Sequence, residues 1–271
     1  MTGQAAYAFD NAHELQRERL QALEAALDAG TIRVLHGCGI EPGWRCLEVG
    51  AGGGSIADWT CEQVGPEGGV LATDLDTTVL QARSRPNLDI RVHDVVADEL
   101  PRASFDLVHM RLLLAWLPER RAVLRRLLGA LKPGGWLVVE ELDFASVATA
   151  QAPDARSGAA FERVLAAHLD VLRERSGFEP GYGRRLPADM RSAGVDDVSC
   201  EGRVSFWGDG NAGMRVWRLT FLQLRAAMLA AGTPAHDVDR AIELCDEPGM
   251  SCLSPVVMAG WGRGAPAVRG R

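Results

Sequence analysis

A glycine-rich turn between an apolar segment and a helix-forming segment constrains this chain more than any other stretch. Residues 44–49 read Trp-Arg-Cys-Leu-Glu-Val, residues 50–54 read Gly-Ala-Gly-Gly-Gly, and a helical pattern begins at Ser55. A strand that passes through glycines into a helix lets a nucleotide-like ligand lie against bare backbone, because residues without Cβ permit close approach and unusual φ and ψ angles. The stretch therefore predicts an α/β fold with a nucleotide-like ligand at this turn.

The spacing of the glycines distinguishes between two kinds of ligand. A dinucleotide-binding turn has glycines at its first, third and sixth positions, and counting from Gly50 the sixth position is Ser55. The pattern acid-x-Gly-x-Gly-x-Gly fits better, with Glu48, Gly50, Gly52 and Gly54. At these positions the chain resembles the first motif of the class I S-adenosylmethionine (SAM)-dependent methyltransferases.

The resemblance covers about residues 44–142, because further motifs follow in the order of that family. They are Asp74, Asp94, the pair Phe105-Asp106 and the Lys-Pro-Gly-Gly turn at 132–135. The chain is similar to the subset related to ubiquinone- and menaquinone-biosynthesis methyltransferases. This resemblance implies an α/β fold with a Rossmann-like, seven-stranded, mostly parallel sheet and helices on both faces. It also implies an N-terminal helical cap and inserted helices over the substrate site.

Asp74 is the predicted ribose ligand. It ends a predicted second strand at 70–73 and follows Gly50 at close to the offset of about 20 residues expected of such an acid. A carboxylate at this edge of the sheet can accept hydrogen bonds from both ribose hydroxyls. Asp76 is the competitor, and we interpret it as the cap of a helix beginning at Thr77, a position that Asp favours.

Asp94 follows a predicted third strand at 89–92, and in the family that it resembles an acid there often binds the adenine amino group. The alternative is a turn residue, which an Asp after a strand often is. Arg111 has two readings as well: a partner of the cofactor carboxylate, or a structural bridge to an acid such as Glu141. The resemblance implies this cofactor-binding set: Tyr7, Glu48, Gly50, Ala51, Gly52, Gly54, Ser55, Asp74, Leu75, Asp94, Val95, His109 and Arg111.

Two histidines are the candidates for a catalytic base, although no motif specifies one. Methyl transfer from a sulfonium is an in-line displacement, for which the protein supplies geometry, a dry pocket and, for a protonated nucleophile, a base. Histidine suits that role near neutral pH. His109 follows a predicted fourth strand at 105–108, and His168 lies on a predicted helix from about 153 to 175. Alternatively, His109 positions backbone for the cofactor and His168 is a hydrogen-bonded core residue.

The rest of the chain predicts helices and two final strands. Two N-terminal helices meet at Gly30, and they form either a pair on the sheet edge or a lid whose Tyr7, Phe9 or His13 reaches the ligand. Further helices are expected at 55–64, 119–131, 185–193, 214–230 and 235–245, and strands at 136–140, 195–206 and 251–261. We expect one methyltransferase domain over 1–271, with a helical cap (1–40), a cofactor-binding core (41–143), substrate-side helices with the last two strands (144–262) and a flexible tail (263–271).

Composition limits the partners. A length of 271 residues with 47% hydrophobic residues suits one α/β domain with an elaboration. A net charge of -7 argues against nucleic acid as a partner. The six cysteines form no Cys-x-x-Cys pair, which predicts buried apolar residues in a reducing compartment and no metal site. Without a signal pattern or an apolar stretch of about 20 residues, a cytoplasmic protein with no membrane partner is expected. Nothing in the sequence predicts the oligomeric state.

The leading functional prediction is a SAM-dependent methyltransferase that modifies an O, N or C nucleophile of a small molecule, in secondary metabolism. An NAD(P)-dependent oxidoreductase shares the strand–glycine–helix arrangement, but Ser55 and Glu48 argue against it. A third possibility is a protein of the methyltransferase fold that binds SAM as a sensor or scaffold, or uses it in a cyclisation. The aromatic residues available for an apolar pocket, each of which also suits the core, are Tyr182, Phe206, Trp207, Trp217 and Phe221.

Overall fold

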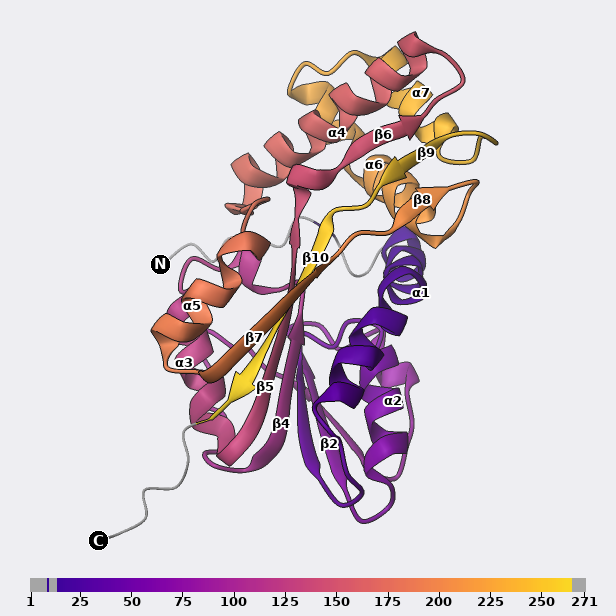
Figure 1. Ribbon diagram of the computed structural model, residues 1–271. Helices are drawn as coiled ribbons and strands as arrows, with labels where there is room; N and C mark the ends of the chain where they lie inside the picture. The colour runs from indigo at the N-terminus through magenta and orange to yellow at the C-terminus, as the bar shows by residue number, and fades with distance from the viewer. Residues whose placement is uncertain (1–8, 10–13, 265–271) are drawn as a thin grey trace, which may run out of the picture. The chain divides into compact units, whose positions relative to one another are not determined.

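The computed structural model describes residue 9 and residues 14–264, and the chain forms two compact units (Figure 1). The sheet unit consists of Asp28–Glu141, Tyr182–Gly202 and the described residues from Val257 onward. The helical unit consists of the described residues up to Leu27, Leu142–Gly181 and Arg203–Val256. Each unit is thus assembled from three separate stretches of sequence. The single-domain organisation of 1–271 stays a prediction, and the tail from 265 onward lies outside the described residues.

The sheet unit is built on a seven-stranded sheet in the order β3-β2-β1-β4-β5-β10-β7. β1 to β5 pair in parallel, and the strand order reverses between β1 and β4. The predicted Rossmann-like, mostly parallel sheet is therefore confirmed. The strand bounds are β1 Arg45–Val49, β2 Gly69–Asp74, β3 Leu88–Val92, β4 Phe105–Arg111, β5 Leu131–Asp143, β7 Asp196–Arg203 and β10 Val256–Arg263.

Helices cover both faces of this sheet, as predicted. In the sheet unit, α2 (Ser55–Val64) and the last part of α1 (Glu14–Gly37) lie on one side, and α3 (Arg120–Ala130) and α5 (Leu186–Ala193) on the other (Figure 1). The buried residues of α2 are Ile56, Ala57, Thr60, Cys61 and Val64, which recur at helical spacing. They pack in one apolar cluster with Val34 and Leu35 of α1 and with Cys46, Val70 and Leu107 of the strands.

The N-terminal helices differ from the prediction. The structure has one continuous helix, α1, which passes through Gly30 instead of ending there. A glycine inside a helix costs only about 1 kcal/mol relative to alanine. Thr31, Val34 and Leu35 follow it at helical spacing and are all buried, so packing outweighs that cost. Tyr7, His13 and the predicted start of the first helix lie outside the described residues.

The helix predicted at Thr77 is also wrong. The chain forms only a short 3-10 turn, η1 (Leu80–Ala82), between β2 and β3. Asp76 nevertheless acts locally as its residue type suggests: its Oδ1 accepts a hydrogen bond from the Thr78 N–H at 2.9 Å. Such a bond forms an Asx turn without a helix behind it.

The two strands predicted last each divide between two sheets. Residues 195–206 become β7 of the large sheet and the start of β8 (Phe206–Gly208), while 251–261 become β9 (Ser251–Leu253) and β10. At the break, the Ser254 N–H donates to the Ser205 carbonyl at 2.8 Å and the Ser205 N–H donates to Ser254 Oγ at 2.9 Å. Pro255 has no N–H to continue a ladder, which is a local reason for the break.

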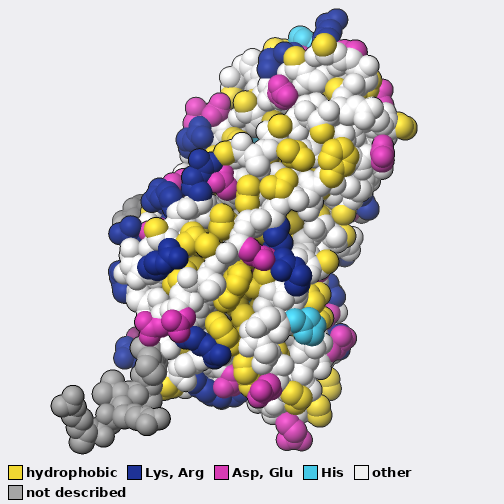
Figure 2. All heavy atoms as spheres, in the orientation of Figure 1, with side chains coloured by type: hydrophobic (Ala, Val, Ile, Leu, Met, Phe, Trp, Pro, Cys, Tyr) yellow, Lys and Arg dark blue, Asp and Glu magenta, His cyan; other side chains and the backbone are white. Residues whose placement is uncertain are grey.

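The helical unit contains α4 (Ala155–Ser176), α6 (Ala212–Ala230) and α7 (Ala235–Leu244), close to their predicted bounds. Its small antiparallel sheet has the order β6-β9-β8, with β6 at Ala148–Gln151. Apolar side chains reach the surface of this unit, where Phe206 and Leu253 are exposed (Figure 2). Within residues 14–264, none of the helices combines the length and apolarity needed to cross a bilayer.

Candidate cofactor site

The glycine turn connects β1 to α2 and adopts the backbone conformation that its glycines allow. Gly50, Gly52 and Gly54 have φ values of 69°, 55° and 86°. The N–H groups of Gly50 and Ala51 both donate to the Thr73 carbonyl of β2, at 2.8 and 2.9 Å. The turn therefore lies at the carboxyl ends of β1 and β2, next to the place where strand order reverses.

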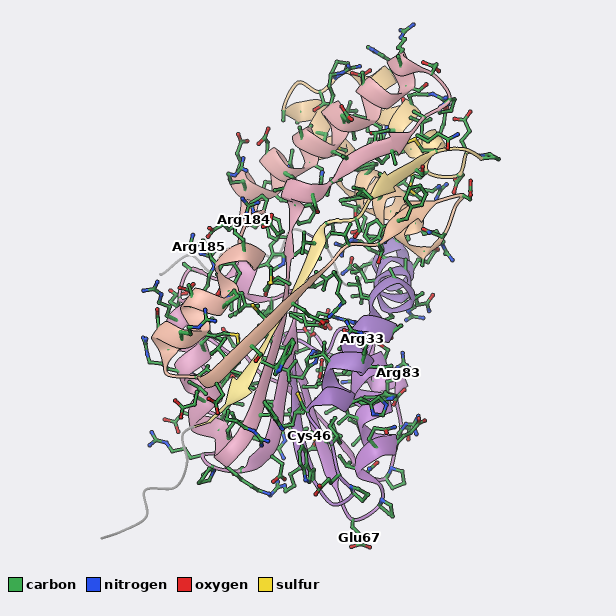
Figure 3. The ribbon with its side chains drawn as sticks, in the orientation of Figure 1. Arg33, Cys46, Glu67, Arg83, Arg184 and Arg185 are labelled. Atoms are coloured by element: carbon green, nitrogen blue, oxygen red, sulfur yellow. The ribbon has the colours of Figure 1, made fainter. Side chains whose placement is uncertain are left out.

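Neighbouring side chains pack closely against two of the glycines. A Cβ on Gly54 would lie 2.6 Å from Leu80 Cδ1, and a Cβ on Gly50 would lie 3.1 Å from Leu113 Cδ2. Arg83, which lies beside α2 in Figure 3, supports the same turn from outside. Its Nε donates to the Gly53 carbonyl and its Nη1 to Asp58, both at 2.7 Å. Sequence reasoning missed Arg83 because no local pattern connects it to the turn.

Asp74 lies beside the turn, at the end of β2. Its Oδ2 accepts a hydrogen bond from the Gly52 N–H at 2.9 Å, and its Oδ1 accepts one from the Asp76 N–H at 3.3 Å. Burial raises the pKa of Asp74 above its ordinary value, although the Gly52 N–H acts in the opposite direction. The side chain of the next residue, Leu75, is 55% exposed. A fixed carboxylate and an exposed apolar side chain thus adjoin the bare backbone.

His109 lies between two buried glutamates on neighbouring strands. The prediction placed it beyond the fourth strand, but β4 continues to Arg111 and His109 is inside it, opposite Glu48 of β1. Its Nδ1 is 2.7 Å from Glu48 Oε2 and its Nε2 is 3.8 Å from Glu140 Oε2 of β5. Burial opposes charge on the imidazole, but the two carboxylates outweigh it and raise the pKa of His109 to about 9. At neutral pH this histidine therefore carries a proton.

The buried polar network continues to α1. The Thr31 hydroxyl donates to Glu140 Oε2. Arg111 donates from Nη1 to Thr31 Oγ1 and from Nη2 to Asp28 Oδ1, each at 2.9 Å. Arg111 therefore bridges to Asp28 on α1, and not to Glu141, which the sequence had suggested as its structural partner.

Asp94 takes part in a turn after β3. Its Oδ1 accepts from the Val96 N–H at 2.8 Å, and its own N–H donates to Asp98 Oδ2 at 2.8 Å. The segment still adjoins the site, because the His93 N–H donates to the Asp74 carbonyl at 2.9 Å. Val95 is buried. The structure thus places Glu48, Gly50–Ser55, Asp74, Leu75, Asp94, Val95, His109 and Arg111 in one unit, whereas Tyr7 lies outside the described residues.

His168 lies in the helical unit within a cluster of aromatic rings. Its ring centroid is 5.3 Å from that of Trp217 and 5.8 Å from that of Phe221. Burial lowers the pKa of His168 to about 4, so the imidazole is neutral near pH 7. Of the aromatic residues considered for a pocket, Phe206 is exposed and the other four are buried in the cores of their units.

The cysteines and the remaining acids suggest no ion site. Five cysteines are buried, as predicted, but the prediction is wrong for Cys200 of β7, which is exposed. In the part of the chain that the structure describes, no group of three or more His, Cys, Asp and Glu side chains could hold a metal ion.

Comparison with known proteins agrees with this geometry. Residues 47–137, which carry the turn, Asp74 and the His109 strand, match the family model for a methyltransferase domain. Residues 47–137 form a SAM-dependent methyltransferase domain. The narrower similarity to ubiquinone- and menaquinone-biosynthesis enzymes stays a prediction.

Two curated relatives match about half of the chain. Methyltransferase str2 of Strobilurus tenacellus is 32% identical over 147 residues, which cover 52% of this chain and 50% of str2. N-methyltransferase gliN of Aspergillus fumigatus is 30% identical over 135 residues, covering 48% of this chain and 46% of gliN. The chain therefore spans about half the length of the curated relatives it matches.

A solved structure has a fold similar to that of this chain. Phosphoethanolamine N-methyltransferase 2 of Haemonchus contortus, in complex with phosphomonomethylethanolamine and S-adenosylhomocysteine, superposes with a TM-score of 0.59 at 13% identity. The superposition covers 96% of this chain and 60% of that one.

Proposed function

We propose that this protein is an enzyme that transfers the methyl group of SAM to an O, N or C nucleophile of a small molecule, in secondary metabolism. The observation that carries the proposal is the turn Gly50–Gly54, which the Gly52 N–H ties to the Asp74 carboxylate at 2.9 Å. The names of the relatives support it: gliN is an N-methyltransferase, and the Haemonchus contortus enzyme was solved with a small phosphorylated amine.

The residues at the turn fit the proposed cofactor. A Cβ at Gly54 would meet Leu80, so a ligand would approach the main chain from the other side of the turn. Asp74 would bind the ribose hydroxyls, and Leu75 with the Asp94–Val95 segment would lie along the adenine. When bound, SAM supplies the activated methyl group. The chain contributes a turn held by hydrogen bonds, a fixed carboxylate and the apolar side chain of Leu75.

The two predicted catalytic histidines differ in what they can do. His109 holds its proton between Glu48 and Glu140, and an imidazolium cannot accept a second proton. We therefore propose that His109 supplies a positive charge between the two glutamates and keeps β1 and β4 in register at the turn. His168 is neutral, and a catalytic role for it stays a prediction.

Calorimetric titration with SAM, S-adenosylhomocysteine and NADH tests the proposal. We expect both sulfur nucleosides to bind and NADH not to bind. Asp74→Asn should weaken SAM binding at least about tenfold through the loss of a charge-assisted hydrogen bond. Asp76→Asn makes the same charge change two residues away and should not weaken it. Equal affinities of the two variants would contradict the ribose role of Asp74.

Turnover separates an enzyme from a protein that only binds SAM. Release of S-adenosylhomocysteine is measured over a panel of phenols, amines and carbon nucleophiles. Release with one class of acceptor supports methyl transfer and identifies the acceptor atom. SAM binding without release on any member of the panel would favour a sensor, a scaffold or a cyclisation, and NADH binding would favour an oxidoreductase.

A further inference from the structure

The loop after β4 holds a side chain against the glycine turn. Leu112, the first residue of the loop, has a φ of 59°, which a leucine rarely adopts. The side chain of Leu113 lies over Gly50, where its Cδ2 would be 3.1 Å from an added Cβ. A leucine in this conformation persists only where surrounding contacts hold it. Two side chains from different elements supply those contacts.

Glu141 of β5 holds the N–H groups of the loop. Its side chain is buried, and its Oε1 accepts hydrogen bonds from the Leu113 N–H at 2.9 Å and from the Leu114 N–H at 2.5 Å. Two convergent backbone donors on one carboxyl oxygen fix the position of that part of the loop. The sequence showed only an acid near the end of a strand, and nothing in it linked Glu141 to the residues 27 and 28 positions earlier.

Arg120 of α3 holds the carbonyl groups of the same loop. Its Nε donates to the Leu114 carbonyl at 2.8 Å and its Nη2 to the Ala115 carbonyl at 3.2 Å. Its guanidinium carbon lies 4.8 Å from the centre of the Tyr182 ring, which keeps the side chain in place. The loop is thus fastened by its donors on one side and by its acceptors on the other.

We propose that Glu141 and Arg120 are positioning residues for methyl transfer, because together they press Leu113 against Gly50 and so fix one wall of the cofactor site. The inference deepens the proposed function and rests on it. Neither residue touches the reacting atoms in this assignment. Their effect passes through the loop 112–115 to the turn, where a displacement of about 1 Å can cost about a hundredfold in rate.

Protonation of Glu141 gives the proposal a specific signature. Burial raises the pKa of Glu141 to about 8, against the opposing effects of the loop N–H groups and Arg120. The charged or titratable groups that face it are Arg120 from α3 and Tyr182, whose own pKa is raised mainly by burial. The Leu113 and Leu114 N–H groups both bind Oε1, and a proton on Oε2 leaves these two bonds in place. A glutamine at 141 would reproduce this neutral form at every pH.

We call the loop closed when Glu141 and Arg120 hold it against Gly50. The population of the closed loop should therefore depend on pH in the wild type and not in Glu141→Gln. A carboxyl group whose pKa is higher in the closed loop than in water favours closure most at low pH. That contribution falls as pH rises from the ordinary carboxyl range through about 8. Between pH 5 and pH 8, SAM affinity of the wild type should decline relative to that of Glu141→Gln.

The test measures hydrogen exchange of residues 112–118 without ligand, together with SAM affinity and kcat, in the full chain. Glu141→Ala and Arg120→Ala should raise exchange in the loop and lower SAM affinity or kcat at least about tenfold. The first removes the acceptor of the Leu113 and Leu114 N–H groups, and the second removes the side-chain donors to the Leu114 and Ala115 carbonyls. Glu119→Gln and Arg125→Ala are the matched controls, because both side chains are exposed and lie on or beside the same helix. Neither control should change exchange or binding.

The outcomes separate this inference from the proposed function. If the wild type binds SAM and turns over, but Arg120→Ala and Glu141→Ala behave like their controls, the positioning role is refuted. A pH dependence of SAM affinity in Glu141→Gln equal to that of the wild type would also refute it. If Glu141→Ala fails to fold, Arg120→Ala and Glu141→Gln still decide the question. If the wild type binds no SAM, the proposed function itself falls, whatever the loop exchange shows.

Discussion

Gly54→Ala should damage both the stability of the sheet unit and its cofactor site. Gly54 has a φ of 86°, and an alanine in the left-handed region costs about 1–2 kcal/mol. The new methyl group would also lie 2.6 Å from Leu80 Cδ1 and 3.0 Å from Arg83 Cγ. Overpacking of this kind costs about 1–3 kcal/mol. Together the two effects predict a loss of about 2–5 kcal/mol in the free energy of unfolding.

Gly194→Ala is the matched control for backbone strain alone. Gly194 ends α5 in the same unit with a φ of 100°, and no atom lies within 4 Å of an added Cβ. It should lose only about 1–2 kcal/mol. Urea denaturation gives both values, and calorimetry with SAM gives the effect on the site.

The difference in unfolding free energy between Gly54→Ala and Gly194→Ala measures the cost of the steric contact at Gly54. Gly54→Ala should also lower kcat/KM by up to about a hundredfold, because relief of the clash displaces the turn. Gly194→Ala should leave kcat/KM unchanged. If Gly54→Ala is no less stable than Gly194→Ala and binds SAM as the wild type does, the close packing assigned to the turn is refuted.

Three further substitutions test the buried charges and the support of the turn. His109→Gln leaves two buried glutamates without their cation and should cost about 3–5 kcal/mol in urea denaturation at pH 6. The pKa of His109 in the folded protein is raised from 6.5 to about 9, so the stability that its charge contributes is complete below pH 6.5 and should be lost as pH rises through 9. A difference in unfolding free energy between wild type and His109→Gln that stays constant up to about pH 9.5 would contradict this. Arg83→Ala removes the hydrogen bond to the Gly53 carbonyl, so it should cost about 1–3 kcal/mol in the free energy of unfolding and weaken SAM binding. Arg85 also forms a salt bridge with Asp58 but makes no bond to the turn, so Arg85→Ala should leave SAM binding unchanged in calorimetry. The wild type should lose stability as pH falls toward 4, because buried His168 must then take up a proton, and His168→Phe should keep the fold and remove that loss. A loss of kcat in His168→Phe with SAM affinity retained would support the predicted role of His168 as a base.

The fold class and the glycine turn could be predicted from the sequence because their causes are local. A glycine turn, the helix after it and an acid at the end of the next strand depend on spacing along the chain, and α2 begins at Ser55 and ends at Val64 as predicted. Asp74 was singled out for the same reason, and it lies beside the Gly52 N–H. Parallel strands place their carboxyl ends at one edge, so residues that follow them meet without any long-range information.

The pairings that join distant residues depend on the packed structure and have no local signal. Alternation of apolar residues does not say which sheet a strand enters, so the divisions at Ser205 and Ser254 could not be foreseen. The same holds for His109: its position between two glutamates depends on the register of three adjacent strands. A histidine in isolation titrates near neutral pH, and only burial beside two carboxylates turns it into a lasting cation. Local sequence specifies where a ligand can approach the backbone. The charges around that place follow from the packed structure, since burial and charge pairing are properties of neighbours in space.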